Sequence, residues 1–234
     1  QGFAMHPGTP RIDPAIAAIA PGFRALSITV EAAPIRHPAV AEQALQRACA
    51  ALLAGEPAWA EAHLAAWAEV FRRFGAKPQR TPCSAEALRK RVLRDASLPV
   101  IDPVVDLYNA ISVQFAIPVG GENLAAYIGT PRLVIADGNE LFDTMKDGTP
   151  AHESPDAGEV VWRDDLGVTC RRWNWRQGVR TRLDAEARRM WFILESLPQM
   201  PLEVLQGAGE QLIAGLQEMM PGAKAEALLV ACRE

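Results

Sequence analysis

The chain has 234 residues, of which 49% are hydrophobic, so it is long enough to bury a sizeable core in one domain. No apolar run reaches the ~18 residues that cross a bilayer and no secretory signal is recognisable, so we expect a cytoplasmic protein without a membrane partner. The four cysteines and four histidines are scattered without disulfide or ligand spacing, which argues against a disulfide framework and a metal site.

The predicted elements begin after a short leader. Gln1-Gly2-Phe3-Ala4 has the composition of a cleaved tag, so we expect one domain over residues 5–234. Alternation over 25–30 predicts a first strand. The Ala-rich residues 39–95 predict a helical insertion, because apolar side chains recur three and four apart. It divides at Gly55-Glu56-Pro57, and its last helix starts at Ser84.

A further helix is predicted over 103–115. An Asp at position 102 can accept hydrogen bonds from the unpaired amides of the first helical turn. Pro103 costs no hydrogen bond at the first helical position, because an amide there would have no partner within the helix. After this helix, the paired glycines Gly120 and Gly121 predict a tight connection that a ligand or another backbone can approach closely.

The second half is predicted to mix strands and helices. Alternation predicts a strand over 132–136 and a hairpin with strands at 159–163 and 168–175, with a loop rich in Gly, Pro and acid between them. Helices are predicted over 184–198 and 202–220. These elements indicate a single α/β domain.

Charge is unevenly distributed along the chain. The net charge of −4 alone discourages a nucleic-acid partner, but 69–94 and 171–189 are basic and 137–165 is acidic. For the first basic stretch, a solvated helix face and a binding surface remain equally open. The second is interleaved with tryptophans, which favours a surface that binds phosphates and stacks bases.

Common catalytic motifs are absent from the sequence. There is no nucleophile elbow, phosphate loop or dinucleotide turn, and no Ser/His or Cys/His pairing that favours covalent hydrolysis. The densest cluster of unusual residues runs from Cys170 to Gln177. On a strand its residues alternate, so one face carries Arg172, Asn174 and Arg176 and the other carries Arg171, Trp173 and Trp175. Alternatively, the tryptophans pack the core and the arginines pair with the acidic stretch.

Four segments agree in order and spacing with one family. They are residues 102–109, 118–122, 158–162 and 170–177, the last followed by Arg180-Thr181. Over about residues 99–195 the chain resembles the free-standing B3/4 domain proteins, relatives of the editing domain in the beta subunit of bacterial phenylalanyl-tRNA synthetase. The resemblance implies a three-layer α+β fold with mixed β-sheets flanked by helices. It also implies hydrolysis of the ester of a mischarged tRNA, without metal or cofactor and without a DNA partner.

The resemblance implies positions for the pocket. In the synthetase domain a Thr-Asn pair on the helix lines the pocket, and Tyr108-Asn109 holds that place here. A loop histidine of the family falls at Gly120, and a late carboxylate matches Glu195. Because the groups that read a phenol are not kept, tyrosine is a less suitable substrate.

Some free-standing relatives act on arginine tRNA that carries canavanine, an arginine analogue with an oxygen in place of one side-chain methylene. A guanidinium-type side chain requires carboxylates, and Asp106, Glu122 and Glu195 are the candidates. A donor that meets the extra oxygen would favour the analogue, because an unmet buried donor costs ~1–3 kcal/mol.

The ester is already activated, so the site needs only to position a water and stabilise an oxyanion. We expect separate groups of residues to stabilise the oxyanion, orient the water, bind the substrate and bind the tRNA phosphates. The oxyanion donors are the Gly120 and Gly121 amides with Asn109 or Asn174, and Glu195 or Glu122 orients the water. The substrate-binding residues are Asp106, Tyr108, Glu122, Arg172, Trp173, Asn174, Trp175, Arg176 and Gln177, and the tRNA phosphates meet Arg180, Arg89 and Arg91.

Other functions remain open at this point. They are a deacylase for phenylalanine tRNA that carries tyrosine, a tRNA-binding module without catalysis, and a sensor of a free amino acid. The sequence does not predict the oligomeric state.

Overall fold

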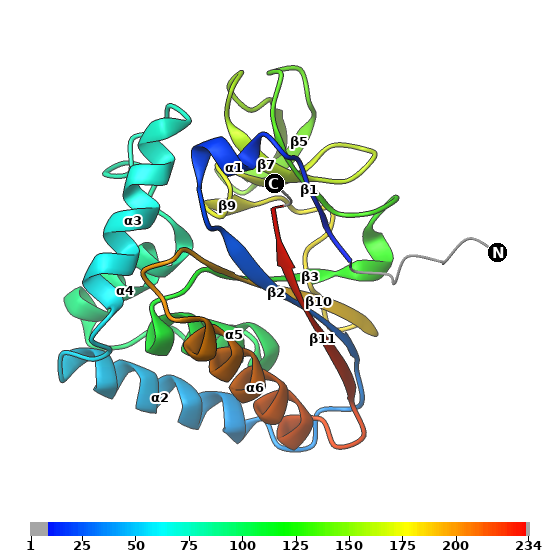
Figure 1. Ribbon diagram of the computed structural model, residues 1–234. Coiled ribbons are helices and arrows are strands. Elements are labelled where there is room, and N and C mark those ends of the chain that lie inside the picture. Colours follow the sequence, from blue (N-terminus) through cyan, green and yellow to red (C-terminus); the bar gives the residue numbers. More distant parts are fainter. Residues whose placement is uncertain (1–8, 233–234) are drawn as a thin grey trace.

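The computed structural model describes residues 9–232, and the expected tag remnant at 1–4 lies outside them (Figure 1). The helices are α1 (Ile16–Ile19), α2 (Ala39–Leu53), α3 (Ala60–Arg73), α4 (Ser84–Asp95), α5 (Pro103–Phe115), α6 (Leu202–Met219) and the 3-10 helix η1 (Leu124–Ala126). The strands are β1 (Arg11–Ile12), β2 (Arg24–Glu31), β3 (Val119–Asn123), β4 (Arg132–Ile135), β5 (Phe142–Lys146), β6 (Thr149–Glu153), β7 (Val160–Arg163), β8 (Val168–Arg171), β9 (Arg176–Gln177), β10 (Arg189–Ser196) and β11 (Lys224–Ala231).

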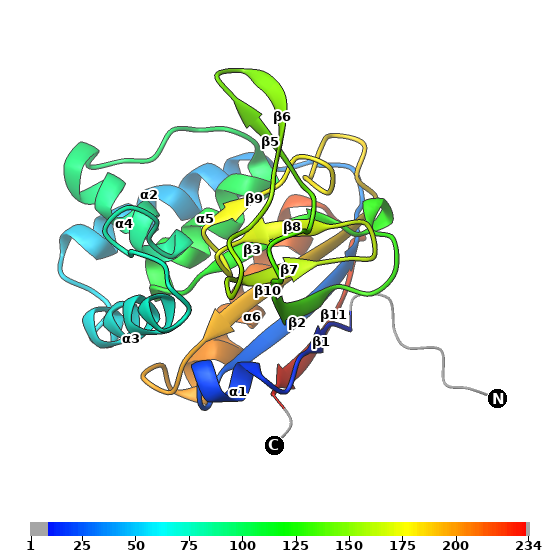
Figure 2. The ribbon, with the colours of Figure 1, turned by 90° about the horizontal axis from the view of Figure 1, so that it is seen from above.

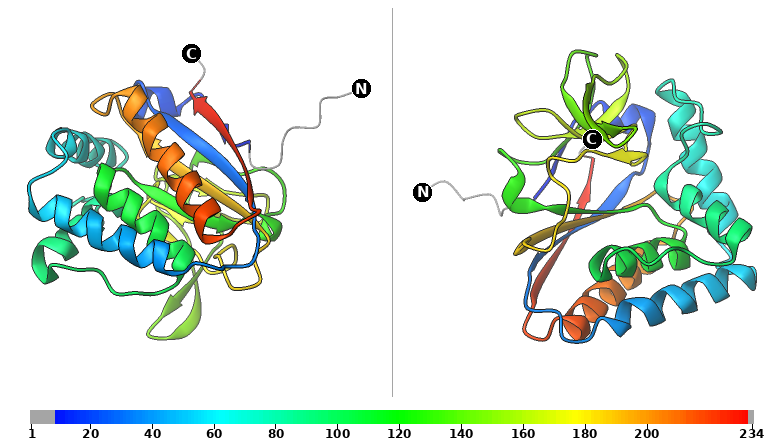
Figure 3. Two further views of the ribbon diagram at one scale, coloured as in Figure 1. Left: turned by 90° about the horizontal axis from the view of Figure 1, so that it is seen from below. Right: turned by 180° about the vertical axis from the view of Figure 1, so that it is seen from behind.

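Three layers stack on one another (Figure 3). Helices α2, α5 and α6 form the first layer. The second is a sheet of order β11-β2-β10-β3, and the third is a sheet of order β1-β4-β7-β8-β5-β6 with β9 beside β8. Helices α3 and α4 stand at one side, and the β5–β6 hairpin projects from the third layer (Figure 2). The architecture is the three-layer α+β fold with flanking helices that the resemblance implies, with the second layer an antiparallel sheet and the third a mixed sheet.

Strand β10 lies inside the second layer, paired antiparallel with β2 and with β3. Phe192 and Leu194 pack in the core beneath the helices, while Trp191 and Ile193 pack in the core between the two sheets. Both faces of this strand are therefore buried, and Glu195 is carried inward with them.

The helix predicted over 184–198 is wrong, because β10 occupies most of that range. A strand that buries both faces reads as a continuous apolar run, which periodicity does not distinguish from a buried helix. The residues around Gly120 and Gly121 form strand β3 in place of the predicted tight connection. The predicted loop before residue 159 contains the β5–β6 hairpin.

Several predictions of local structure are confirmed. Strand β2 contains the predicted 25–30, and the helical insertion divides at Gly55-Glu56-Pro57. Helix α5 spans the predicted 103–115, and Asp102 Oδ1 accepts from the amides of Val104 at 2.9 Å and Val105 at 3.3 Å. Such a cap contributes about 1 kcal/mol to a helix. Helix α4 begins at Ser84, although its N-cap is the preceding residue and no side chain caps it.

Among residues 9–232, no helix combines the length and the apolarity that crossing a membrane requires.

Candidate functional site

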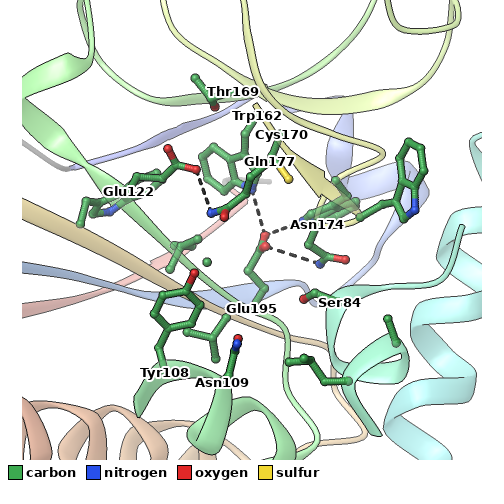
Figure 4. Close-up of a pocket in the computed structure, with 18 of the residues that line it drawn as sticks. Ser84, Tyr108, Asn109, Glu122, Trp162, Thr169, Cys170, Asn174, Gln177 and Glu195 are labelled. Carbon is green, nitrogen blue, oxygen red and sulfur yellow. Dashed lines mark hydrogen bonds between the residues drawn. The ribbon is translucent and has the colours of Figure 1, made fainter. Parts of the chain in front are cut away.

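A cavity of about 240 Å³ lies between helix α5 and the segment that joins β8 to β9 (Figure 4). Strands β3 and β10 form its floor, and helix α4 contributes one edge. The side chains around it are mostly aromatic, amide or carboxyl groups. The residues that line it are Ser84, Ala87, Leu88, Tyr108, Asn109, Val119, Gly120, Glu122, Tyr127, Trp162, Thr169, Cys170, Trp173, Asn174, Trp175, Gln177, Trp191, Ile193 and Glu195.

Glu195 is a buried carboxyl group near the end of β10. Trp162 Nε1 donates to its Oε2 at 3.2 Å and Trp173 Nε1 at 2.5 Å, while Asn174 Nδ2 donates to Oε1 at 3.4 Å. Burial raises the pKa of Glu195 to about 8, and these three donors limit the rise. Glu195 therefore exchanges a proton near neutral pH while two indoles hold its position.

The segment after β8 forms a turn that directs Trp173 and Asn174 inward. Arg172 and Trp173 have positive φ angles of 46° and 62°, so strand β8 ends at Arg171. The predicted alternation of faces over 171–176 is therefore wrong. Two tight backbone bonds close the turn, from the Trp173 amide to the Val160 carbonyl at 2.6 Å and from the Asn174 amide to the Arg172 carbonyl at 2.7 Å.

Glu159 holds this turn in place. Its carboxylate accepts from Arg171 Nη2 at 2.8 Å and Nε at 3.2 Å, and from the Arg172 amide at 3.0 Å. Charge-assisted bonds of this bidentate kind are among the strongest that proteins form. The strained backbone at Arg172 and Trp173 is thus stabilised by a buried ion pair outside the cavity.

Glu122 is the second buried carboxyl group of the cavity. Gln177 Nε2 donates to its Oε1 at 2.8 Å and to the Gly121 carbonyl at 3.1 Å. Burial raises the pKa of Glu122 to about 8, and the nearby Thr181 hydroxyl and Arg180 guanidinium limit the rise. Oε2 of Glu122 is buried on the side of the Thr181 and Tyr127 hydroxyls, which lower the pKa of this carboxyl group.

Helix α5 presents Tyr108 and Asn109 to the cavity (Figure 4). The Tyr108 ring lies against β3, where a Cβ on Gly121 would come within 2.7 Å of the ring. A glycine at 121 therefore serves this packing. Asn109 is half-buried and lines the cavity from the helix side.

The two glycine amides differ in their surroundings. Two carbonyls of this segment show which backbone groups face β10. The Pro118 carbonyl accepts from the Glu195 amide and so faces β10, whereas the Gly121 carbonyl accepts from the Gln177 side chain and so faces away from β10. Because backbone groups alternate along a strand, the Gly120 amide points into the ladder with β10. The Gly120 amide is therefore not the free donor that we expected, and the Gly121 amide points away from β10, on the side of β3 that the 181–182 segment pairs with.

Three arginines do not take the positions that the sequence analysis expected. Arg89 is buried and donates to the Val113 carbonyl at 2.6 Å and the Glu56 carbonyl at 3.2 Å, so it joins helices and does not face phosphates. Arg180 holds the buried Asp164 through bonds of 2.6 and 2.8 Å. Arg172 Nη1 donates to the Thr81 hydroxyl at 2.8 Å, outside the cavity.

Asp106 is also away from the cavity. Its carboxylate accepts from the Ile101 amide at 3.0 and 3.2 Å and supports the entry to α5, so it is not a substrate carboxylate. Arg176 lies at the rim beside Trp175, with its guanidinium carbon 5.8 Å from the ring centre. Arg91 is exposed on α4, with its Nε 3.9 Å from Asp95.

Sequence reasoning missed several cavity residues. Trp162 and Trp191 were not proposed, because they lie on strands β7 and β10, which are buried on both faces, so alternation does not indicate which side chains reach the cavity. Cys170 also lines the cavity, where burial raises the pKa of its thiol well above the usual value. A thiol of that kind is a poor nucleophile at neutral pH. Among residues 9–232, no group of three His, Cys, Asp or Glu side chains is arranged to hold a metal ion.

Comparison with known proteins agrees with this geometry. An N-terminal fragment of the phenylalanyl-tRNA synthetase beta-subunit from Pyrococcus horikoshii has a similar fold, with a TM-score of 0.53 and 10% sequence identity. The match covers 95% of this chain and 54% of that chain, so this chain spans about half of that fragment. No curated protein matches the sequence significantly. The family model for the B3/4 domain matches residues 66–202, which include α5 and every strand that lines the cavity. The chain therefore belongs to the B3/4 domain family.

Proposed function

We propose that the protein hydrolyses the ester that joins a wrong amino acid to tRNA. One observation carries this proposal: two buried carboxyl groups, amide side chains and aromatic walls meet in a cavity whose size suits an amino-acid side chain. The similarity in fold to a fragment of a phenylalanyl-tRNA synthetase beta-subunit supports a substrate that contains tRNA.

The reaction needs no covalent intermediate. A water oxygen attacks the ester carbonyl carbon, the bond to the ribose oxygen breaks, and the ribose hydroxyl and the free amino acid leave. One proton of the water passes to the ribose oxygen. Asn109 is suited to donate to the oxyanion, and Glu195 or Glu122 orients the water.

Canavanyl-tRNA for arginine is the substrate that suits the cavity best. A guanidinium-type group packs favourably on indole faces, which Trp162, Trp173 and Trp191 supply around the cavity. The Glu122 carboxyl group, which lines the cavity, is an acceptor for such a group. A donor such as the Asn109 side-chain amide would meet the extra oxygen of canavanine, which arginine lacks.

Tyrosine-type mischarged phenylalanine tRNA is the alternative substrate. With a pKa of about 8, Glu122 is largely neutral at pH 7, and a neutral carboxyl group can exchange hydrogen bonds with a phenol. A non-catalytic tRNA-binding module would use the same cavity to hold the amino acid without releasing it.

One set of reactions separates these functions. The protein is incubated with tRNA charged in turn with arginine, canavanine, phenylalanine and tyrosine, and loss of each ester is followed with time. We expect canavanine to be released fastest and arginine to be spared. Faster release of tyrosine would favour the alternative substrate. Tight binding of every charged tRNA without release would refute hydrolysis.

A further inference from the structure

We propose that Arg176 and Arg182 form a subsite for a phosphate at the RNA 3′ terminus. The subsite is a depression of about 270 Å³ beside the aminoacyl cavity, lined by these two arginines, Thr144, Gln177 and the backbone after β9. No carboxyl group lines it. Gln177 lines both this depression and the aminoacyl cavity, so the two are neighbours. This inference rests on the proposed function.

The acidic side chains of the region pair with other arginines and not with these two. Arg171 is paired with Glu159, Arg172 with Asp156, and Arg180 with Asp164. By contrast, Arg176 and Arg182 form no ion pair with any residue in 9–232. Two unneutralised guanidinium groups in one depression favour an anion from outside the chain.

Arg176 is held ready for this role. Its Nη2 donates to the Met145 carbonyl on β5 at 2.9 Å, and its guanidinium lies near the Trp175 ring. The backbone behind it is closely packed, because a Cβ on Gly178 would lie 2.9 Å from the Asp143 carbonyl. A fixed guanidinium loses little freedom when it binds, which strengthens the contact.

Arg182 is positioned by the strand that also presents Glu122. Its backbone forms an isolated antiparallel bridge with Glu122, and the Asn123 amide donates to the Thr181 carbonyl at 2.8 Å. The side chain of Arg182 is exposed. Asp143 on β5 lies 2.7 Å from His152 Nδ1 and forms no ion pair with Arg176 or Arg182.

These positions match the chemistry of a charged 3′ end. The aminoacyl ester sits on the terminal ribose, so a phosphate of the last nucleotides must lie next to the cavity that holds the amino acid. Guanidinium groups bind phosphate oxygens in bidentate geometry. The RNA would then enter over β9 and β5, and β5 lies at the opposite end of the molecule from α2 (Figure 1).

The test uses uncharged tRNA, so it does not depend on hydrolysis. Binding to the full chain is measured by fluorescence anisotropy over a series of salt concentrations. We expect R176A/R182A to bind about tenfold or more weakly at low salt, and its salt slope to fall by roughly 1.4, the value for two lost single-strand contacts. R176K/R182K keeps the charge and should keep the slope.

The matched control is R36A/R47A, which removes two charges from the exposed start of the helical layer. It should bind like the wild type. R182A alone provides a second variant, because an exposed side chain can be removed with little effect on folding. Equal affinities of R176A/R182A and R36A/R47A, or failure of the wild type to bind tRNA, would overturn the subsite. Intact arginine-dependent binding without ester loss would instead refute only the proposed function.

Discussion

Asn109 and Glu195 show how individual residues shape the cavity. The Asn109 side chain extends from α5 and forms no hydrogen bond with any residue in 9–232. Its side-chain amide is therefore available to a substrate. Glu195, in contrast, already accepts from two indoles and an amide. The first is therefore suited to act on a bound group, and the second to remain fixed while its protonation changes.

Replacing Asn109 with alanine should slow ester hydrolysis far more than it weakens tRNA binding. Loss of one oxyanion donor typically costs about 10²–10³ in kcat. Single-turnover hydrolysis and tRNA affinity are measured side by side, with Gln46→Ala on the exposed face of α2 as the matched loss of an amide. Unchanged turnover in N109A would remove Asn109 from the mechanism.

Glu195→Gln should flatten the dependence of stability on pH. The folded pKa of about 8 lies above the unfolded value of 4.5, so the stabilisation is complete below pH 4.5 and is lost as pH rises through 8. Each such group contributes a slope of about 1.4 kcal/mol per pH unit in this window.

Urea unfolding at several pH values measures this slope. E195Q should also be less stable at low pH, because an amide offers one acceptor where the carboxyl group offers two oxygens. A wild-type slope retained in E195Q would show that Glu195 does not titrate in this range.

Among the elements, the turn over residues 172–175 depends on a support outside the cavity. Glu159, which precedes β7, binds Arg171 and the Arg172 amide on the next strand. It is buried, whereas Glu153, the other partner of Arg171, is partly exposed. The shape of one wall of the cavity is therefore set by a pair of charges that never contacts the ligand.

Glu159→Gln should destabilise the fold and reduce hydrolysis together. Removing one charge of a buried pair costs up to about 3–5 kcal/mol, and Arg171 would then keep only its partly exposed partner Glu153. The control is Glu153→Gln, whose partly exposed pair is worth less than about 1 kcal/mol. Thermal unfolding and single-turnover hydrolysis are compared. Equal effects of the two variants would contradict the assigned role of Glu159.

Elements whose ends are specified by neighbouring residues could be predicted from the sequence, whereas elements that depend on distant residues could not. Asp102 and Pro103 specify the start of α5 by themselves, and that prediction is confirmed. Strand β10 carries Glu195 on a run that is apolar on both faces, so only the surrounding layers reveal its conformation. The inward turn at Trp173 depends on Glu159, which is distant in sequence and offers no local signal.

At the scale of the whole molecule, a buried histidine connects helix α3 to the layers beside it. His63 on α3 contacts the Ala116 carbonyl through Nδ1 at 2.7 Å and accepts from the Leu197 amide through Nε2 at 3.1 Å. Accepting at Nε2 requires a neutral ring with its proton on Nδ1. Burial lowers the pKa of His63 to about 4. His63 thus links the helical side to the ends of α5 and β10.

The stability of the whole chain should reflect His63 and the two glutamates together. His63 contributes stability above its unfolded pKa of 6.5, and this is lost as pH falls toward 4. Glu122 and Glu195 act in the opposite direction between pH 4.5 and 8. The free energy of unfolding should therefore fall gently from pH 4.5 to 6.5 and more steeply from 6.5 to 8.

His63→Gln tests this balance by removing the titrating ring. In H63Q the shallow portion of the curve should become as steep as the portion above pH 6.5, as measured by urea unfolding at half-unit intervals of pH. A curve of unchanged shape would show that His63 does not oppose the glutamates.

The indoles around Glu195 have an optical consequence. Of the six tryptophans in the chain, Trp162, Trp173, Trp175 and Trp191 line the cavity, and two of them donate directly to the carboxyl group. Their emission should therefore change in wavelength and intensity whenever a guest molecule enters or the carboxyl proton leaves. The protein carries its own fluorescent reporter of occupancy, which allows unlabelled compounds to be screened by simple titration.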